Sequence, residues 1–123
     1  MRWERAPALQ IEVNRLARRL FNLIDIQRVI VFRSYDSKSK ALARIWGLPR
    51  IWQLALKVKP HYCLEVISEK FDQQSKENQQ RILVHELMHI PKNFSGSLLT
   101  HRGRGRAINK REAEKIFRKL TCF

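Results

Sequence analysis

The 123-residue sequence contains few cysteines and no long hydrophobic run. No apolar stretch approaches the roughly 20 residues that a membrane-spanning helix needs, which argues against an integral membrane protein. The first nine residues, MRWERAPAL, lack the apolar segment of a secretory signal. Because Cys63 and Cys122 are the only two cysteines, free thiols in a reducing compartment are favoured over a disulfide. We therefore expect a cytoplasmic protein.

Acidic residues are also scarce, with 11 Asp and Glu against 25 Lys and Arg and a formal net charge of +14. Residues 1–60 hold 13 basic and 4 acidic side chains (+9), and residues 101–123 hold 8 and 2 (+6). Residues 61–100 hold 4 and 5 (−1), so the excess lies in the two ends. Basic ends attract polyanions, and non-specific binding of DNA or RNA through the termini is one interpretation. Simple solubility explains the same charge equally well.

The sequence shows no repeat, low-complexity tract or linker, so we expect one domain over residues 1–123. Apolar residues at helical spacing indicate a helix over 8–23, and Ser75 as an N-cap marks the start of a second helix over 75–89. A basic segment indicates a third helix over 109–120. Runs rich in β-branched and aromatic residues predict strands over 27–34, 41–48, 50–58 and 63–71. The segment 50–58 is ambiguous between strand and short helix, and the strand is favoured.

These elements predict an α+β fold. A small mixed or antiparallel sheet would pack on the N-terminal helix and on the helix over 75–89, with the basic helix at the C-terminus. Trp46 and Trp52 have apolar neighbours. Their rings are therefore expected in the core, rather than on a base-stacking surface together with Trp3 and Phe32.

Residues 85–89 read HELMH and form the clearest functional motif. In a helix, residues four apart lie on one face, so His85 and His89 could reach one metal ion from the same side. Glu86 stands beside them, where its carboxylate could act on a metal-bound water. This is the H-E-x-x-H pattern of zinc metallopeptidases, in which the glutamate is a base and not a ligand. The alternative is a helix with two surface histidines near its C-terminus, where the dipole favours their charge.

A catalytic zinc usually has three protein ligands and an open fourth position, so a third ligand is required. No aspartate follows His89, and the metzincin pattern is absent because Ser95 occupies the place of its third histidine. His101 is the favoured candidate, since a proline-terminated helix and a glycine-containing loop precede it and leave enough chain to fold back. Three further candidates stay open: Glu112, Glu114 and, more remotely, Cys122.

From Ser34 to His101 the sequence resembles a family of small metallopeptidases found in archaea and phages. The matching pieces are RSYDSKSKALARIWGLPRIWQ, PHYCLEVISEKFD and RILVHELMHIPKNFSGSLLTH. In that family a helix bearing HELxHIP precedes a short F-x-G-x-L loop and a histidine. The corresponding residues here are Phe94, Gly96, Leu98 and His101. More distantly, the sequence resembles SprT-like proteases.

The resemblance implies a minimal zincin domain that hydrolyses protein or peptide substrates. It implies zinc held by His85, His89 and His101, with Glu86 as the general base. In zincins an extended substrate pairs with an edge strand before the active-site helix, and the strand expected over 63–71 is the candidate. The alternative function is a basic nucleic-acid-binding module whose zinc is structural and closed by a fourth protein ligand. A protease associated with DNA would combine both.

Overall fold

The computed structural model describes residues 1–101 and 108–120. Its strands are β1 (Arg2–Arg5), β2 (Val29–Tyr35), β3 (Ala43–Gly47) and β4 (Tyr62–Ile67). Its helices are α1 (Pro7–Leu20), α2 (Arg50–Leu56), α3 (Ser68–Phe71), α4 (Lys76–Leu87) and α5 (Lys110–Phe117), with 3-10 turns at Ile26–Arg28 and Arg118–Leu120. The predicted α+β class with a small mixed sheet is confirmed. None of the helices in these two ranges is long and apolar enough to cross a membrane.

The four strands form one sheet in the order β1-β2-β4-β3. β2 and β4 are parallel neighbours at its centre, β1 is antiparallel to β2, and β3 is antiparallel to β4. The prediction that 63–71 is an edge strand is therefore wrong, because β4 pairs on both sides. The last four residues of the predicted segment 63–71 are also helical and form α3. Of the strands that pair with β4, β3 is the one at an edge of the described sheet.

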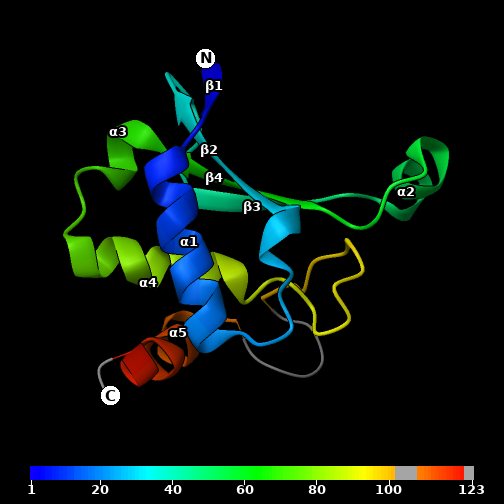
Figure 1. Cartoon of the computed structure of the whole chain (residues 1–123). Helices are drawn as coiled ribbons and strands as arrows, with labels where there is room; N and C mark the ends of the chain where they lie inside the picture. Colours follow the sequence, from blue (N-terminus) through cyan, green and yellow to red (C-terminus); the bar gives the residue numbers. More distant parts are fainter. Residues whose placement is uncertain (102–107, 121–123) are drawn as a thin grey trace.

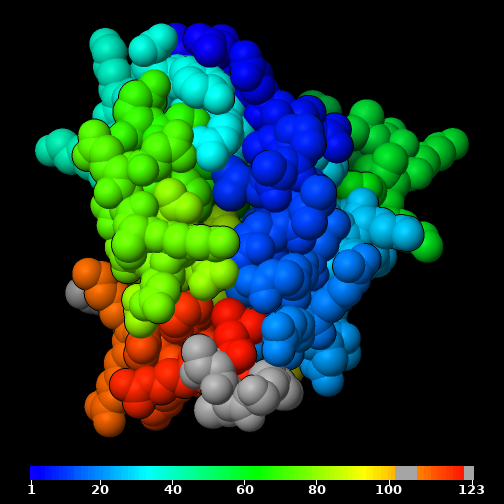
Figure 2. All heavy atoms as spheres, turned by 60° about the vertical axis from the view of Figure 1, so that its left-hand side comes forward, coloured from blue at the N-terminus to red at the C-terminus, as the bar shows by residue number. Residues whose placement is uncertain are grey.

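Helices α1 and α4 pack side by side against the sheet, and α5 packs on α4 (Figures 1 and 2). Alternate residues of the central strands, including Val31, Leu64 and Val66, are fully buried beneath them. The predicted start of α4 is confirmed, since the Ser75 side chain accepts a hydrogen bond from the backbone N–H of Asn78 at 3.1 Å. This packing fixes the direction of α4 and so the placement of the HELMH residues at its end.

The segment 50–58 is helical, so the favoured prediction of a strand is wrong. Pro49 precedes α2, and Lys57 ends it in the left-handed conformation with φ 56°. Gln53 is the only buried residue of α2, and its Nε2 donates to the carbonyls of Leu48 and Ser95, both at 2.8 Å. A buried polar residue surrounded by exposed apolar ones reverses the usual pattern, which is why periodicity misled the prediction. α2 projects from the body of the molecule (Figure 1).

Two further differences from the sequence-based expectation concern two tryptophans and the first strand. Trp46 and Trp52 are 47% and 55% exposed, so the prediction of core packing for their rings is wrong. Trp46 lies on the sheet face opposite to Ile45, which packs against the core. Strand β1 was not predicted at all, because its four residues, RWER, are exposed and lack an apolar pattern.

Candidate metal centre

The end of α4 brings two histidines of the HELMH motif together. The apolar residues before and within the motif, Leu83, Val84 and Leu87, are fully buried and anchor the helix. The helical path continues beyond Leu87 through the bond from the His89 N–H to the Glu86 carbonyl at 3.1 Å. The rings of His85 and His89 therefore lie on one side, with centroids 5.3 Å apart.

The loop that follows α4 is tied to the helix end by two hydrogen bonds. The N–H of Leu99 donates to the His89 carbonyl at 2.7 Å, and the His89 Nδ1 lies 2.6 Å from the Leu99 carbonyl oxygen. Because a carbonyl can only accept, Nδ1 carries the hydrogen and Nε2 keeps its lone pair. Metal-ligating histidines characteristically use this second bond to fix ring orientation and tautomer. His101 follows two residues after this anchor.

The same loop is also held from the sheet. The Tyr62 hydroxyl donates to the Ser97 carbonyl and accepts from the Gly96 N–H, both at 2.8 Å. Gly96 has φ 95°, and a Cβ on Gly47 of β3 would lie 2.1 Å from the Gly96 oxygen. Glycine is thus required at both positions, at one for its backbone angle and at the other for the close approach. Sequence reasoning missed this support, because Gly47, Tyr62 and Gly96 lie far apart along the chain.

The three histidines predicted as ligands form one cluster. His101 Nε2 lies 3.3 Å from His85 Nε2, and one nitrogen from each of His85, His89 and His101 lies within 4.8 Å of the others. In a tetrahedral site with Zn–N bonds of about 2.0–2.1 Å, two ligating nitrogens lie roughly 3.3–3.4 Å apart. The donor set and its spacing therefore fit a single metal ion.

Burial and neighbouring charges favour the neutral imidazole at His85 and His89. The pKa of His85 is lowered to about 4, mainly by burial and also by the charges of His89, His101 and Lys110. Burial also lowers the pKa of His89, although its hydrogen bond to Leu99 opposes the shift. A metal requires the neutral imidazole, and a site that disfavours protons leaves the lone pairs available.

Glu86 has a different environment from its histidine neighbours. Its carboxyl is not among the donors of the cluster, and burial raises its pKa to about 7. A carboxyl with a pKa near neutrality can both take up and release a proton there. A perturbed carboxyl next in sequence to a candidate ligand makes Glu86 a candidate for an acid–base role.

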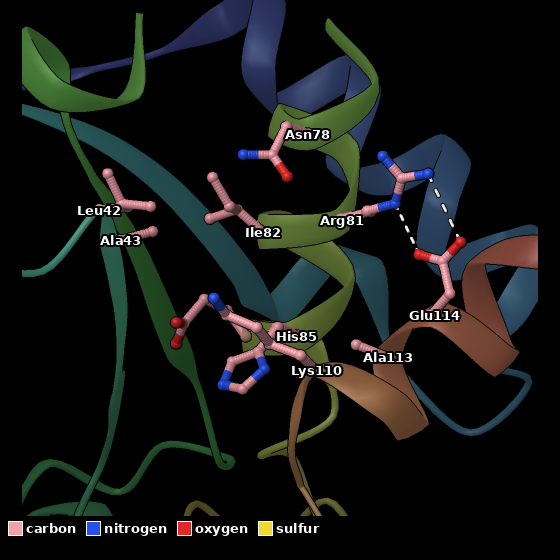
Figure 3. A pocket seen from close by; sticks show the side chains of 10 residues that line it. Leu42, Ala43, Asn78, Arg81, Ile82, His85, Lys110, Ala113 and Glu114 are labelled. Atoms are coloured by element: carbon pink, nitrogen blue, oxygen red, sulfur yellow. Dashed lines mark hydrogen bonds and ion pairs between the residues drawn. The ribbon is translucent and has the colours of Figure 1, made fainter. Parts of the chain in front are cut away.

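The other candidates for a third ligand are engaged elsewhere. Glu114 forms an ion pair with Arg81 at 2.6 Å (Figure 3), and Glu112 pairs with Lys115 at 3.3 Å. Neither joins the histidine cluster. Cys122 lies outside the described residues. Of the alternatives that the sequence left open, the structure brings His101 to the motif and pairs both glutamates with basic side chains.

A pocket of about 430 Å³ opens beside His85 and Glu86. Figure 3 shows apolar side chains on one side of it, with Leu42 and Ala43 at the start of β3 and Ile82 on α4. Helix α5 contributes Lys110, Ala113 and Glu114 to its other side. The pocket thus joins the candidate metal centre to the beginning of an edge strand.

A family model described as "Putative phage metallopeptidase" matches residues 1–115. The match spans α4, the loop after it and all three histidines, so it includes the whole candidate site. No curated protein and no solved structure matches the chain.

Proposed function

Because the chain belongs to the family of putative phage metallopeptidases, we propose that it is a zinc-dependent endopeptidase with His85, His89 and His101 as ligands. The observation that carries the proposal is the convergence of three imidazole nitrogens, two of them 3.3 Å apart, with the half-buried Glu86 next to His85 in the sequence. Nitrogen donors suit zinc, and the spacing matches tetrahedral coordination. Zinc, when bound, supplies a Lewis acid and lowers the pKa of a bound water to about 7.

Glu86 is the proton carrier in this proposal. A base that serves an attacking water must lie near that water without occupying the metal itself. The carboxyl of Glu86 fits this requirement, since it stands outside the three-nitrogen cluster and its pKa is raised by burial to about 7. Such a group accepts the proton of the water and later donates it to the leaving amine of the peptide.

The substrate is proposed to bind as an extended chain along the free edge of β3. This strand pairs with β4 on one side, and no described strand pairs with its other side. Leu42 and Ala43, at its beginning, line the same pocket as His85 and Glu86. Main-chain hydrogen bonds to an edge strand give affinity without demanding one sequence, and the apolar pocket wall would receive one substrate side chain.

The second candidate is a nucleic-acid-binding module with structural zinc. Structural zinc is usually closed by four protein ligands. Within residues 1–101 and 108–120, the cluster holds three donors, and Glu112 and Glu114 are paired with basic side chains. This arrangement supports an open position and so favours the peptidase.

The decisive variant is Glu86→Gln, measured for bound zinc and for cleavage of casein and a quenched fluorescent peptide library. Glutamine keeps the shape of the side chain and removes the proton acceptor. We expect about one zinc per chain, as in the parent, and cleavage reduced by about 10²–10⁴-fold. Glu77→Gln is the matched control, because Glu77 lies on the same helix with a side chain 75% exposed.

Two results would count against the proposal. Cleavage that persists in Glu86→Gln would show that the activity comes from another mechanism or another protein. Loss of zinc in that variant would make Glu86 a ligand and the site a closed one, which is the signature of the structural alternative.

A further inference from the structure

The sheet face that points away from α1 and α4 carries three aromatic side chains, one each from β1, β2 and β3. Residues alternate between the two faces, so Val31 of β2 lies in the core while Phe32 lies on the opposite face. Trp3 of β1 and Trp46 of β3 lie on this same face, at 54% and 47% exposure. Burial in the core therefore does not explain these two tryptophans, and we call the surface the aromatic face.

The aromatic face is hollowed. Trp3, Phe32, Trp46, Cys63 and Glu65 line a depression of about 290 Å³. This volume lies close to the lower end of the range for small-molecule sites, roughly 300–1,000 Å³. A flat aromatic group, rather than a large ligand, is the kind of guest that such a depression admits. Rings from β1, β2 and β3 would present π-surfaces to it.

A buried carboxylate stands in the floor of this depression. Glu65 is 1% exposed, and its Oε1 accepts hydrogen bonds from Arg44 Nε and Trp46 Nε1, both at 2.9 Å. Its Oε2 is also buried, and no described donor meets it with full hydrogen-bond geometry, although the Ser34 and Trp3 side chains lie close enough to help lower the pKa of this carboxyl. A buried acceptor without a well-placed donor is costly, so this oxygen can gain a further hydrogen bond from a bound molecule. Amino groups on the edge of a nucleobase are donors of that kind.

Two arginine side chains lie against aromatic rings of this face. The Arg44 guanidinium lies 4.9 Å from the Trp46 ring centroid, and the Arg5 guanidinium lies 5.7 Å from that of Phe32. Between residues 37 and 64 the sequence has six Lys and Arg and no acidic residue. A surface with aromatic groups and cations suits a polyanion that also carries exposed aromatic rings. A surface that binds only phosphates would need the cations but not the aromatic groups.

We propose that the aromatic face binds single-stranded nucleic acid. Bases stack on Trp3, Phe32 and Trp46, and an amino group of one base donates to Glu65 Oε2. The phosphates lie near Arg5 and Arg44. Duplex nucleic acid cannot bind in this way, because its bases are stacked on one another and its phosphates face outward. The site lies on the sheet face opposite to α4 and its histidines, so binding requires no metal and is independent of the peptidase proposal.

The test compares three probes by fluorescence anisotropy on the full-length chain: a labelled 15-nucleotide single-stranded DNA, its duplex, and labelled polyphosphate. Trp3→Ala and Phe32→Ala should each weaken binding of the single strand by about fivefold to 150-fold, as expected for one stacked base. Affinity for the duplex and for polyphosphate should change by less than twofold. Trp52→Ala is the matched control, since Trp52 is equally exposed but lies on α2.

The variants also separate stacking from charge. Arg5→Gln should lower the slope of log affinity against log salt by roughly one unit, while Trp3→Ala should leave that slope unchanged. Replacing Arg102, Arg104 and Arg106 by glutamine tests the basic C-terminal segment, and we expect it to weaken all three probes alike. Circular dichroism of each variant verifies folding, and Trp3 itself is 54% exposed on the edge strand β1.

Two results would overturn the proposal. Equal affinity for single strand and duplex, unchanged by Trp3→Ala and Phe32→Ala, would show that only charge attracts nucleic acid. A dimer that dissociates in Trp3→Ala, without selective binding of the single strand, would show that a second copy of the chain covers the aromatic face.

Discussion

Removing one oxygen atom from Tyr62 should weaken metal binding, although this residue is not a candidate ligand. Tyr62→Phe keeps the ring, which contacts Phe94 edge-on with centroids 4.9 Å apart. It deletes the hydroxyl that donates to the Ser97 carbonyl and accepts from the Gly96 N–H. These bonds hold the loop that carries the Leu99 carbonyl to His89. The variant therefore loosens the loop while leaving the three histidines unchanged.

The expected loss of metal affinity follows from the burial of the two backbone groups that lose their hydrogen bond to Tyr62. Ser97 is exposed, so its carbonyl can bond to water at little cost. Gly96 is buried, and an unpaired buried N–H costs about 1–3 kcal/mol. If the metal requires the loop in place, this free energy is lost from metal affinity. Since 1.4 kcal/mol corresponds to a factor of ten, we expect an affinity about fivefold to 150-fold weaker.

The assay is a competition for zinc between the protein and a chromophoric chelator, with urea unfolding of the metal-free chain measured in parallel. Tyr35→Phe is the matched control, because Tyr35 is the only other tyrosine and lies at the end of β2, with its ring against the Arg2 guanidinium. We expect no change in that variant. Zinc affinity within twofold of the parent in Tyr62→Phe, at unaltered stability, would refute the reasoning that this clamp positions the site.

The remaining predictions concern the third candidate ligand, the contact between Gly47 and Gly96, and the Glu86 carboxyl. His101→Ala should reduce zinc affinity severely and Glu112→Ala should not, and the reverse result in equilibrium dialysis would exchange their roles. Gly47→Ala should weaken zinc binding and lower the melting temperature, because the added Cβ would meet the Gly96 oxygen at 2.1 Å. In chelator-treated protein, Glu86→Gln should raise the free energy of unfolding at pH 8 but not at pH 4.5. Burial raises the pKa of this carboxyl to about 7, so folding penalises its ionised form, and equal gains at both pH values would contradict the shift.

The part of the site that the sequence predicts is the part that local geometry determines. His85 and His89 lie four residues apart, and the helical repeat alone places them on one face. The stop after them is local too, since Pro91 restricts the residue before it and α4 ends at Leu87. The helix boundaries near the motif were therefore predictable to within two residues.

Predictions failed where contacts from distant segments decide the structure. The segment 50–58 has apolar residues that suit a strand, but Gln53 gains its hydrogen bonds to Leu48 and Ser95 from the helical conformation. Strand order could not be predicted either, because no local sequence signal indicates that β3 pairs with the outer side of β4 and leaves β4 in the interior of the sheet. Such pairings depend on which edges remain free once the helices have packed.

The position of His101 combines both kinds of information. Its distance along the chain shows only that the loop is long enough to return to α4. The return itself depends on Tyr62 in β4, on Gln53 in α2 and on the contact between Gly47 and Gly96. Tyr62, Gln53 and Gly47 each lie at least 30 residues before His101. The candidate metal centre is therefore completed by the sheet and α2 and not by the motif helix alone, so we expect substitutions at Tyr62 and Gly47 to alter metal affinity as well as those beside the histidines.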